Sequence, residues 1–105
     1  MDIQELRLEL NQIDKELSAL FARRMMISGQ VAEYKREHNM PVLDQSREQE
    51  VIARAVEGKP EEVAEYIRLL YGHILELSRA YQHAKLATGE YIYHEYDNGR
   101  SIKKI

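Results

Sequence analysis

Apolar residues recur at alternating spacings of three and four along the first third of the chain. The series runs through Ile3, Leu6, Leu10, Ile13, Leu17, Leu20, Ile27, Val31 and Tyr34. This heptad spacing predicts one long helix with an apolar seam. Asp2 and Glu5 form a capping-box pattern at its start, and Pro41 forbids continuation at its end. We therefore expect a helix from Ile3 to between Arg36 and His38.

A helix of this length does not fit inside a domain of 105 residues. At about 1.5 Å per residue, roughly 35 residues form a rod about 50 Å long. A compact domain of about 100 residues has a radius of gyration near 13 Å. The rod would overhang its own domain with its seam uncovered, and a homodimer would cover it.

Arg24 interrupts the seam at the position where the spacing calls for an apolar residue. A buried guanidinium needs an anion, which is either a carboxylate of the protein or a carboxylate of a ligand. From the spacing alone, Arg24 is open to two interpretations: a polar residue that fixes helix register, or a ligand clamp. Lys35 lies on almost the same face, roughly 16 Å further along the axis, so the two cations can flank one small molecule.

Two further helices are expected after the loop that contains Pro41. Asp44 is a good N-cap for a helix that runs to about Glu57. Its first turn holds Arg47 and Glu48; the helix dipole favours Glu48 there but opposes Arg47. Pro60 opens a third helix, which ends near Thr88 and Gly89.

The inward face of the third helix ends in two polar side chains. Ser78 and Gln82 lie one turn apart and continue the row of Tyr71, Ile74 and Leu75. They are either packing residues at the margin of the face or hydrogen-bonding groups of a site.

The sequence predicts an all-α protomer with a changed pattern at its end. Residues 1–88 form the helical domain, and residues 89–105 form a short β-hairpin or a flexible tail. The tail is β-prone at Tyr91-Ile92-Tyr93 and has a tight-turn signal at Asp97-Asn98-Gly99.

Composition excludes several classes of function. The chain has no cysteine, and its four histidines lack paired metal-ligand spacing, so we expect neither a metal nor another cofactor. The net charge is −3 with no concentrated basic run, which argues against nucleic acid and anionic membranes as partners. Neither a signal peptide nor an apolar run near 20 residues is visible, so we expect a cytoplasmic protein.

Several short motifs, in order and at these separations, resemble the all-helical, type II class of chorismate mutases. They are Leu6-Arg7, Ile13-Asp14, Arg23-Arg24, Val31 to Lys35, Pro41-Val42 and Asp44 to Glu48, followed by Ser78 and Gln82. The resemblance covers roughly residues 3–86. It implies a three-helix protomer intertwined as a homodimer with shared active sites. It also implies conversion of chorismate to prephenate, a step toward phenylalanine and tyrosine, without a cofactor.

The resemblance assigns site roles to charged and polar residues: Arg7 (from the partner chain), Arg24, Lys35, Asp44, Arg47, Glu48, Ser78 and Gln82. The arginines, assisted by the serine, would hold the substrate carboxylates. Lys35 and Gln82 would hydrogen-bond the ether oxygen, and Glu48 with the Asp44 region would hold the ring hydroxyl.

Two alternatives remain open at this point. An isochorismate-pyruvate lyase of the same fold would use a similar cationic site, although the acidic residues Asp44 and Glu48 favour the mutase. A non-catalytic dimeric helical interaction module would use Arg24 only to fix register. Docking of the tail to another aromatic-pathway enzyme is also left open.

Overall fold

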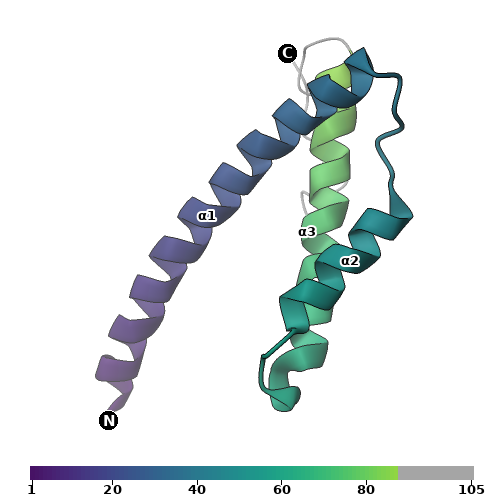
Figure 1. The fold of residues 1–105 in the computed structure, drawn as a ribbon. Helices are drawn as coiled ribbons and strands as arrows, with labels where there is room; N and C mark the ends of the chain where they lie inside the picture. Colours follow the sequence, from purple (N-terminus) through teal and green to yellow (C-terminus); the bar gives the residue numbers. More distant parts are fainter. Residues whose placement is uncertain (88–105) are drawn as a thin grey trace, which may run out of the picture.

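The computed structural model describes residues 1–87, which form three helices and no strand. They are α1 (Ile3–Glu37), α2 (Gln45–Val56) and α3 (Glu61–Ala87) (Figure 1). The all-α prediction and its three helices are confirmed. The predicted hairpin or tail at 89–105, and the domain boundary before it, lie outside the described residues.

The ends of α1 follow from local side-chain chemistry. The Asp2 carboxylate accepts a hydrogen bond from the Glu5 backbone N–H at 2.9 Å, and the Glu5 carboxylate accepts one from the Asp2 N–H at 3.0 Å. At the other end His38 is the C-cap, and Asn39 follows with φ of 54°. Asparagine tolerates this left-handed conformation, which reverses the chain into the loop before α2.

The shorter helices begin as their first residues indicate. The Asp44 side chain caps α2 by accepting a hydrogen bond from the Arg47 backbone N–H at 3.1 Å. Gly58, with φ of 74°, lies between α2 and α3. The first turn of α3 carries Glu61 and Glu62, which the helix dipole stabilises.

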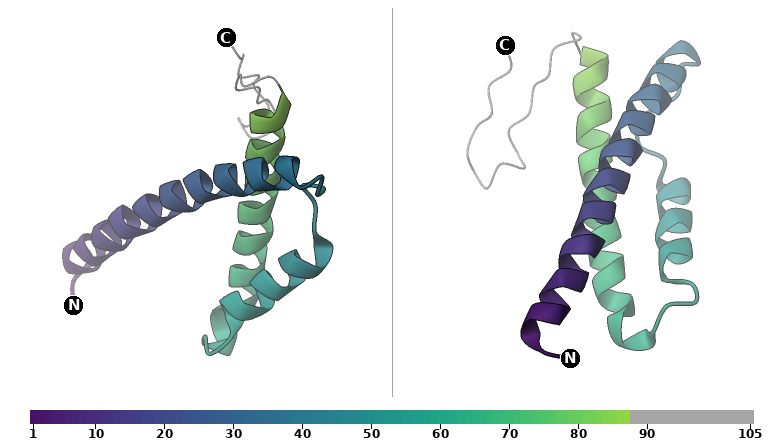
Figure 2. Two further views of the ribbon diagram at one scale, coloured as in Figure 1. Left: turned by 45° about the horizontal axis from the view of Figure 1, so that its top comes forward. Right: turned by 90° about the vertical axis from the view of Figure 1, so that its left-hand side faces the viewer.

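Helix α3 is the element on which the other two pack. The α2 helix runs antiparallel beside the first part of α3, and α1 crosses α3 near the carboxy-terminal ends of both (Figures 1 and 2). The amino-terminal part of α1 diverges from the other helices. The molecule measures 52 × 33 × 23 Å, and its radius of gyration is 16.5 Å, above the roughly 13 Å of a compact domain of this size.

Small side chains allow α1 to approach α3 closely where they cross. Ser28, Gly29 and Ala32 are the buried residues of α1. A Cβ atom on Gly29 would lie 3.1 Å from Cε2 of Tyr81 on α3, tighter than ordinary van der Waals contact. The backbones therefore come close enough here for short polar side chains of the two helices to touch.

The seam of α1 is not covered within this chain. Every residue from 1 to 20 is exposed, including Leu6, Leu10, Leu17 and Leu20 of the seam. In the part of the chain that the structure describes, no large side chain is fully buried. The packing between helices of one chain thus leaves the longest apolar stripe open to solvent.

Candidate active site

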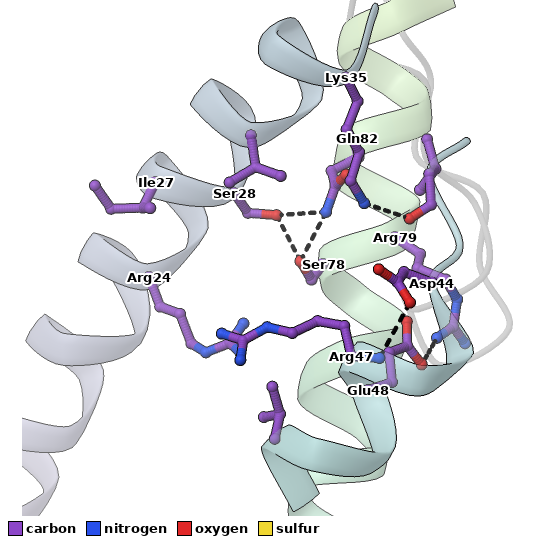
Figure 3. A pocket seen from close by; sticks show the side chains of 13 residues that line it. Arg24, Ile27, Ser28, Lys35, Asp44, Arg47, Glu48, Ser78, Arg79 and Gln82 are labelled. Carbon is purple, nitrogen blue, oxygen red and sulfur yellow. Dashed lines mark hydrogen bonds and ion pairs between the residues drawn. The ribbon is translucent and has the colours of Figure 1, made fainter. Parts of the chain in front are cut away.

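A pocket of about 320 Å³ opens between the carboxy-terminal half of α1, the start of α2 and the end of α3. Nine of its 13 lining residues are polar or charged, and the other four are isoleucine or valine (Figure 3). The lining residues are Arg24, Ile27, Ser28, Val31, Lys35, Val42, Asp44, Arg47, Glu48, Val51, Ser78, Arg79 and Gln82. All of the site residues expected from the sequence, except Arg7, line this one pocket.

Two guanidinium groups enter the pocket from different helices. Arg24 of α1 and Arg47 of α2 point toward one another in Figure 3. Like charges that converge repel, and an anion between them is attracted to both. Arginine is suited to this role because its planar fork binds a carboxylate through two parallel hydrogen bonds.

Arg47 also has a partner outside the pocket. Its Nη1 donates to Oε1 of Glu50 at 2.7 Å, and Arg54 lies 3.5 Å from the other oxygen of the same carboxylate. The hydrogen bond from Arg47, followed by the charge of Arg54, lowers the pKa of Glu50. Glu50 is exposed, so water screens its attraction to Arg47. An anion in the pocket can therefore compete with Glu50 for Arg47.

Lys35 is held at the pocket by the loop that follows α1. Its Nζ donates to the backbone carbonyl of Val42 at 2.6 Å. An ammonium group has three N–H donors, so this bond fixes the side chain and leaves donors for a ligand. The loop is in reach because the Met40 N–H bonds the Lys35 carbonyl at 2.8 Å and turns the chain back.

The acidic corner of the pocket is tied to a cation that the sequence did not indicate. Glu48 of α2 forms an ion pair with Arg79 of α3, and the two side chains are 21 % and 32 % exposed. Four cations and two carboxylates therefore line the pocket, which leaves a net positive charge facing an anionic ligand. The available signal for Arg79 was its place between Ser78 and Gln82, next to the inward row of α3.

A buried hydrogen-bonded cluster closes the pocket at the crossing of α1 and α3. The hydroxyl groups of Ser28 and Ser78 lie 2.5 Å apart, and Nε2 of Gln82 donates to them at 3.0 and 3.3 Å respectively (Figure 3). Ser28 was also missed from the sequence. The signal for it was the run of small residues Ser28, Gly29 and Ala32, which marks a close helix crossing.

Arg7 lies far from the pocket within this chain. It is exposed on the diverging amino-terminal part of α1 and is not among the lining residues.

Among residues 1–87 there is no helix long and apolar enough to cross a membrane.

A sequence model of the family described as chorismate mutase type II matches residues 6–83 of the chain. This range includes most of α1, all of α2 and every residue that lines the pocket. Comparisons with curated proteins and with solved structures gave no match.

Proposed function

The chain belongs to the type II chorismate mutase family, a family of isomerases, and from that premise we propose that its pocket converts chorismate to prephenate. The observation that carries the proposal is the gathering of Arg24, Arg47 and Lys35 around one cavity beside Gln82. The product would serve the synthesis of phenylalanine and tyrosine.

The reaction is an intramolecular rearrangement in which one carbon–oxygen bond of the ether breaks as one carbon–carbon bond forms. No atom enters or leaves, and no proton is transferred. The enzyme must hold a flexible dianion in its folded, chair-like conformer and stabilise negative charge as it grows on the ether oxygen. Arg24 and Arg47 hold the carboxylates with help from Ser78, which fixes the conformer.

Charge on the ether oxygen is met by donors at the far end of the pocket. Lys35 and Gln82 donate to this oxygen, and the interaction strengthens as the bond breaks. Glu48, supported by the Asp44 region, accepts a hydrogen bond from the ring hydroxyl. In this scheme Arg79 neutralises Glu48, so the carboxylate does not weaken binding of a dianion.

We further propose that two chains form a homodimer and that Arg7 of the second copy completes each pocket. The exposed seam of α1 supports this, because its leucines would be buried by a partner helix. A neighbouring hollow of about 580 Å³ also supports it. Its apolar wall includes Ile67, Leu70 and Tyr71, and it is lined by Arg24 and Arg47 as well, so a helix seated there would lie beside the pocket.

The direct test is to incubate the protein with chorismate and to identify prephenate. We expect Lys35→Ala and Gln82→Ala to lose most of the turnover, by roughly 100-fold or more in kcat, because each removes a donor that the proposal assigns to the developing charge. Helix content and oligomeric mass should not change. Lys15→Ala, which removes an exposed ammonium from the same helix, is the matched control and should keep full activity.

Two results would overturn the proposal. Release of pyruvate from isochorismate, without any prephenate from chorismate, would assign the pocket to a lyase. Full activity of Lys35→Ala and Gln82→Ala would show that these donors are not used.

A further inference from the structure

The side chain of Gln82 is almost completely buried, yet its hydrogen bonding is one-sided. Its Nε2 serves both serine hydroxyls, while its Oε1 is buried without a partner among the described residues. A buried carbonyl without a hydrogen bond is destabilising. The opposite orientation of the Gln82 amide would therefore be favoured wherever it gave Oε1 a hydrogen-bond donor.

Rotation of the terminal amide by half a turn exchanges Oε1 and Nε2 without changing the shape of the side chain. Oε1 would then accept from Ser28 while Ser78 donates to Ser28, and each oxygen of the cluster would be paired. The two N–H groups would occupy the former position of Oε1. A hydroxyl group at position 28 allows both arrangements because it can either donate or accept, whereas an alanine there would leave the amide only its longer contact with Ser78, at 3.3 Å.

Oε1 is enclosed in the chain without substrate, so an ether oxygen meets this end of the amide only after substrate displaces the groups that cover it, and the two orientations differ in what they then offer. A carbonyl oxygen facing the breaking bond would repel the growing negative charge, whereas an N–H group stabilises it. We propose that Ser28 is a positioning residue whose hydroxyl donates to Oε1 of Gln82 when substrate is bound, so that Nε2 faces the ether oxygen. This inference rests on the proposed function and adds a residue to it.

The fold holds Ser28 where this role requires it. Ser28 and Gln82 come from different helices, 54 residues apart in sequence, and both are buried, at 6 % and 7 % exposure. Gly29 and Ala32 keep the two helices close, so the contact between Ser28 and Gln82 depends on the crossing of α1 and α3. Ser28 also lines the pocket, but in this proposal it acts on the reaction through the amide that it orients.

A double-mutant cycle in the full chain tests this role. We expect Ser28→Ala to lower kcat by roughly tenfold with little change in KM, because the ether charge exists only in the transition state. In a Gln82→Ala background, where no amide remains to be oriented, Ser28→Ala should cause no further loss. The residual turnover of that background is measured at high enzyme concentration. Ser18→Ala, an exposed serine of the same helix, is the control and should leave kcat unchanged.

A second measurement separates this inference from the proposed function. If the wild-type chain does not convert chorismate, the proposed function fails, and side-chain amide NMR still tests the cluster. The Gln82 amide signals, identified by their absence in Gln82→Ala, should shift and exchange faster with solvent in Ser28→Ala but not in Ser18→Ala.

Three outcomes would overturn the role of Ser28. Equal losses of kcat from Ser28→Ala in both backgrounds would mean that the residue acts independently of Gln82. A raised KM with unchanged kcat for Ser28→Ala would mean that Ser28 contributes equally to binding of the substrate and of the transition state. Unaltered Gln82 amide signals in Ser28→Ala would show that it does not hold the amide.

Discussion

Leu17 offers a quantitative test of the uncovered seam, because the chain supplies a matched leucine on the opposite face of α1. Leu17 is 51 % exposed and Leu8 is 68 % exposed. They are nine residues apart, about two and a half helical turns, so their side chains point in opposite directions. If a second copy covers the seam, only Leu17 becomes buried.

The expected size of the effect follows from the exposed half of Leu17. Full burial of a leucine side chain is worth about 1.5–3 kcal/mol, so covering this half stabilises the dimer by about 1 kcal/mol per chain. Twofold symmetry doubles the effect to about 2 kcal/mol, which raises the dissociation constant of the Leu17→Ala dimer by roughly 30-fold.

Sedimentation over a dilution series measures that constant directly. Leu8→Ala should dissociate at the wild-type concentration, and the turnover of Leu17→Ala should fall on dilution because, in the proposed dimer, each pocket needs Arg7 of the second copy. Equal dissociation constants for wild type and Leu17→Ala would refute the reasoning, as would weakening by Leu8→Ala alone.

The two helical glycines and Arg79 give further predictions. Gly72→Ala should raise the melting temperature by about 4–8 °C, since nothing lies within 4 Å of its new Cβ and alanine favours helix by about 1 kcal/mol. Gly29→Ala should raise the melting temperature by less than Gly72→Ala, because Tyr81 must move to make room for the new methyl group. It should also lower kcat, because the helix crossing beside the pocket widens. Arg79→Leu should raise KM for chorismate roughly tenfold by leaving its carboxylate partner uncompensated, less so at high salt. Arg68→Leu, which breaks an exposed ion pair of α3, is its control.

Each of these predictions has an outcome that contradicts it. Equal gains in melting temperature and unchanged kcat for both glycine variants would show that the helix crossing tolerates a methyl group. The same KM for Arg79→Leu and Arg68→Leu, measured by steady-state kinetics, would remove Arg79 from the electrostatics of the pocket.

The boundaries of the helices could be predicted from sequence because local interactions determine them. The capping box of Asp2 and Glu5, the Asp44 cap and the turn before Pro41 each involve residues no more than a few positions apart. The common pocket of Arg24 and Lys35 was also foreseeable, since both lie on one helix whose geometry is known.

Contacts between helices were harder to foresee. The heptad spacing identifies an apolar seam on α1 but not which partner covers it. Within the chain α1 packs on α3 through Ser28, Gly29 and Ala32, beside the seam. The pairing of Ser28 with Gln82, and of Arg79 with Glu48, depends on how α3 crosses α1 and α2, which periodicity does not encode.

Mixing two inactive variants tests the central claim, that each pocket performs the rearrangement with Arg7 of a second chain. Arg7→Ala and Lys35→Ala chains are each expected to be inactive alone. After unfolding and refolding together in equal amounts, random pairing gives one intact pocket in each heterodimer, so roughly a quarter of the wild-type chorismate mutase activity should return. No recovery in a mixture that contains heterodimers would contradict the shared pocket.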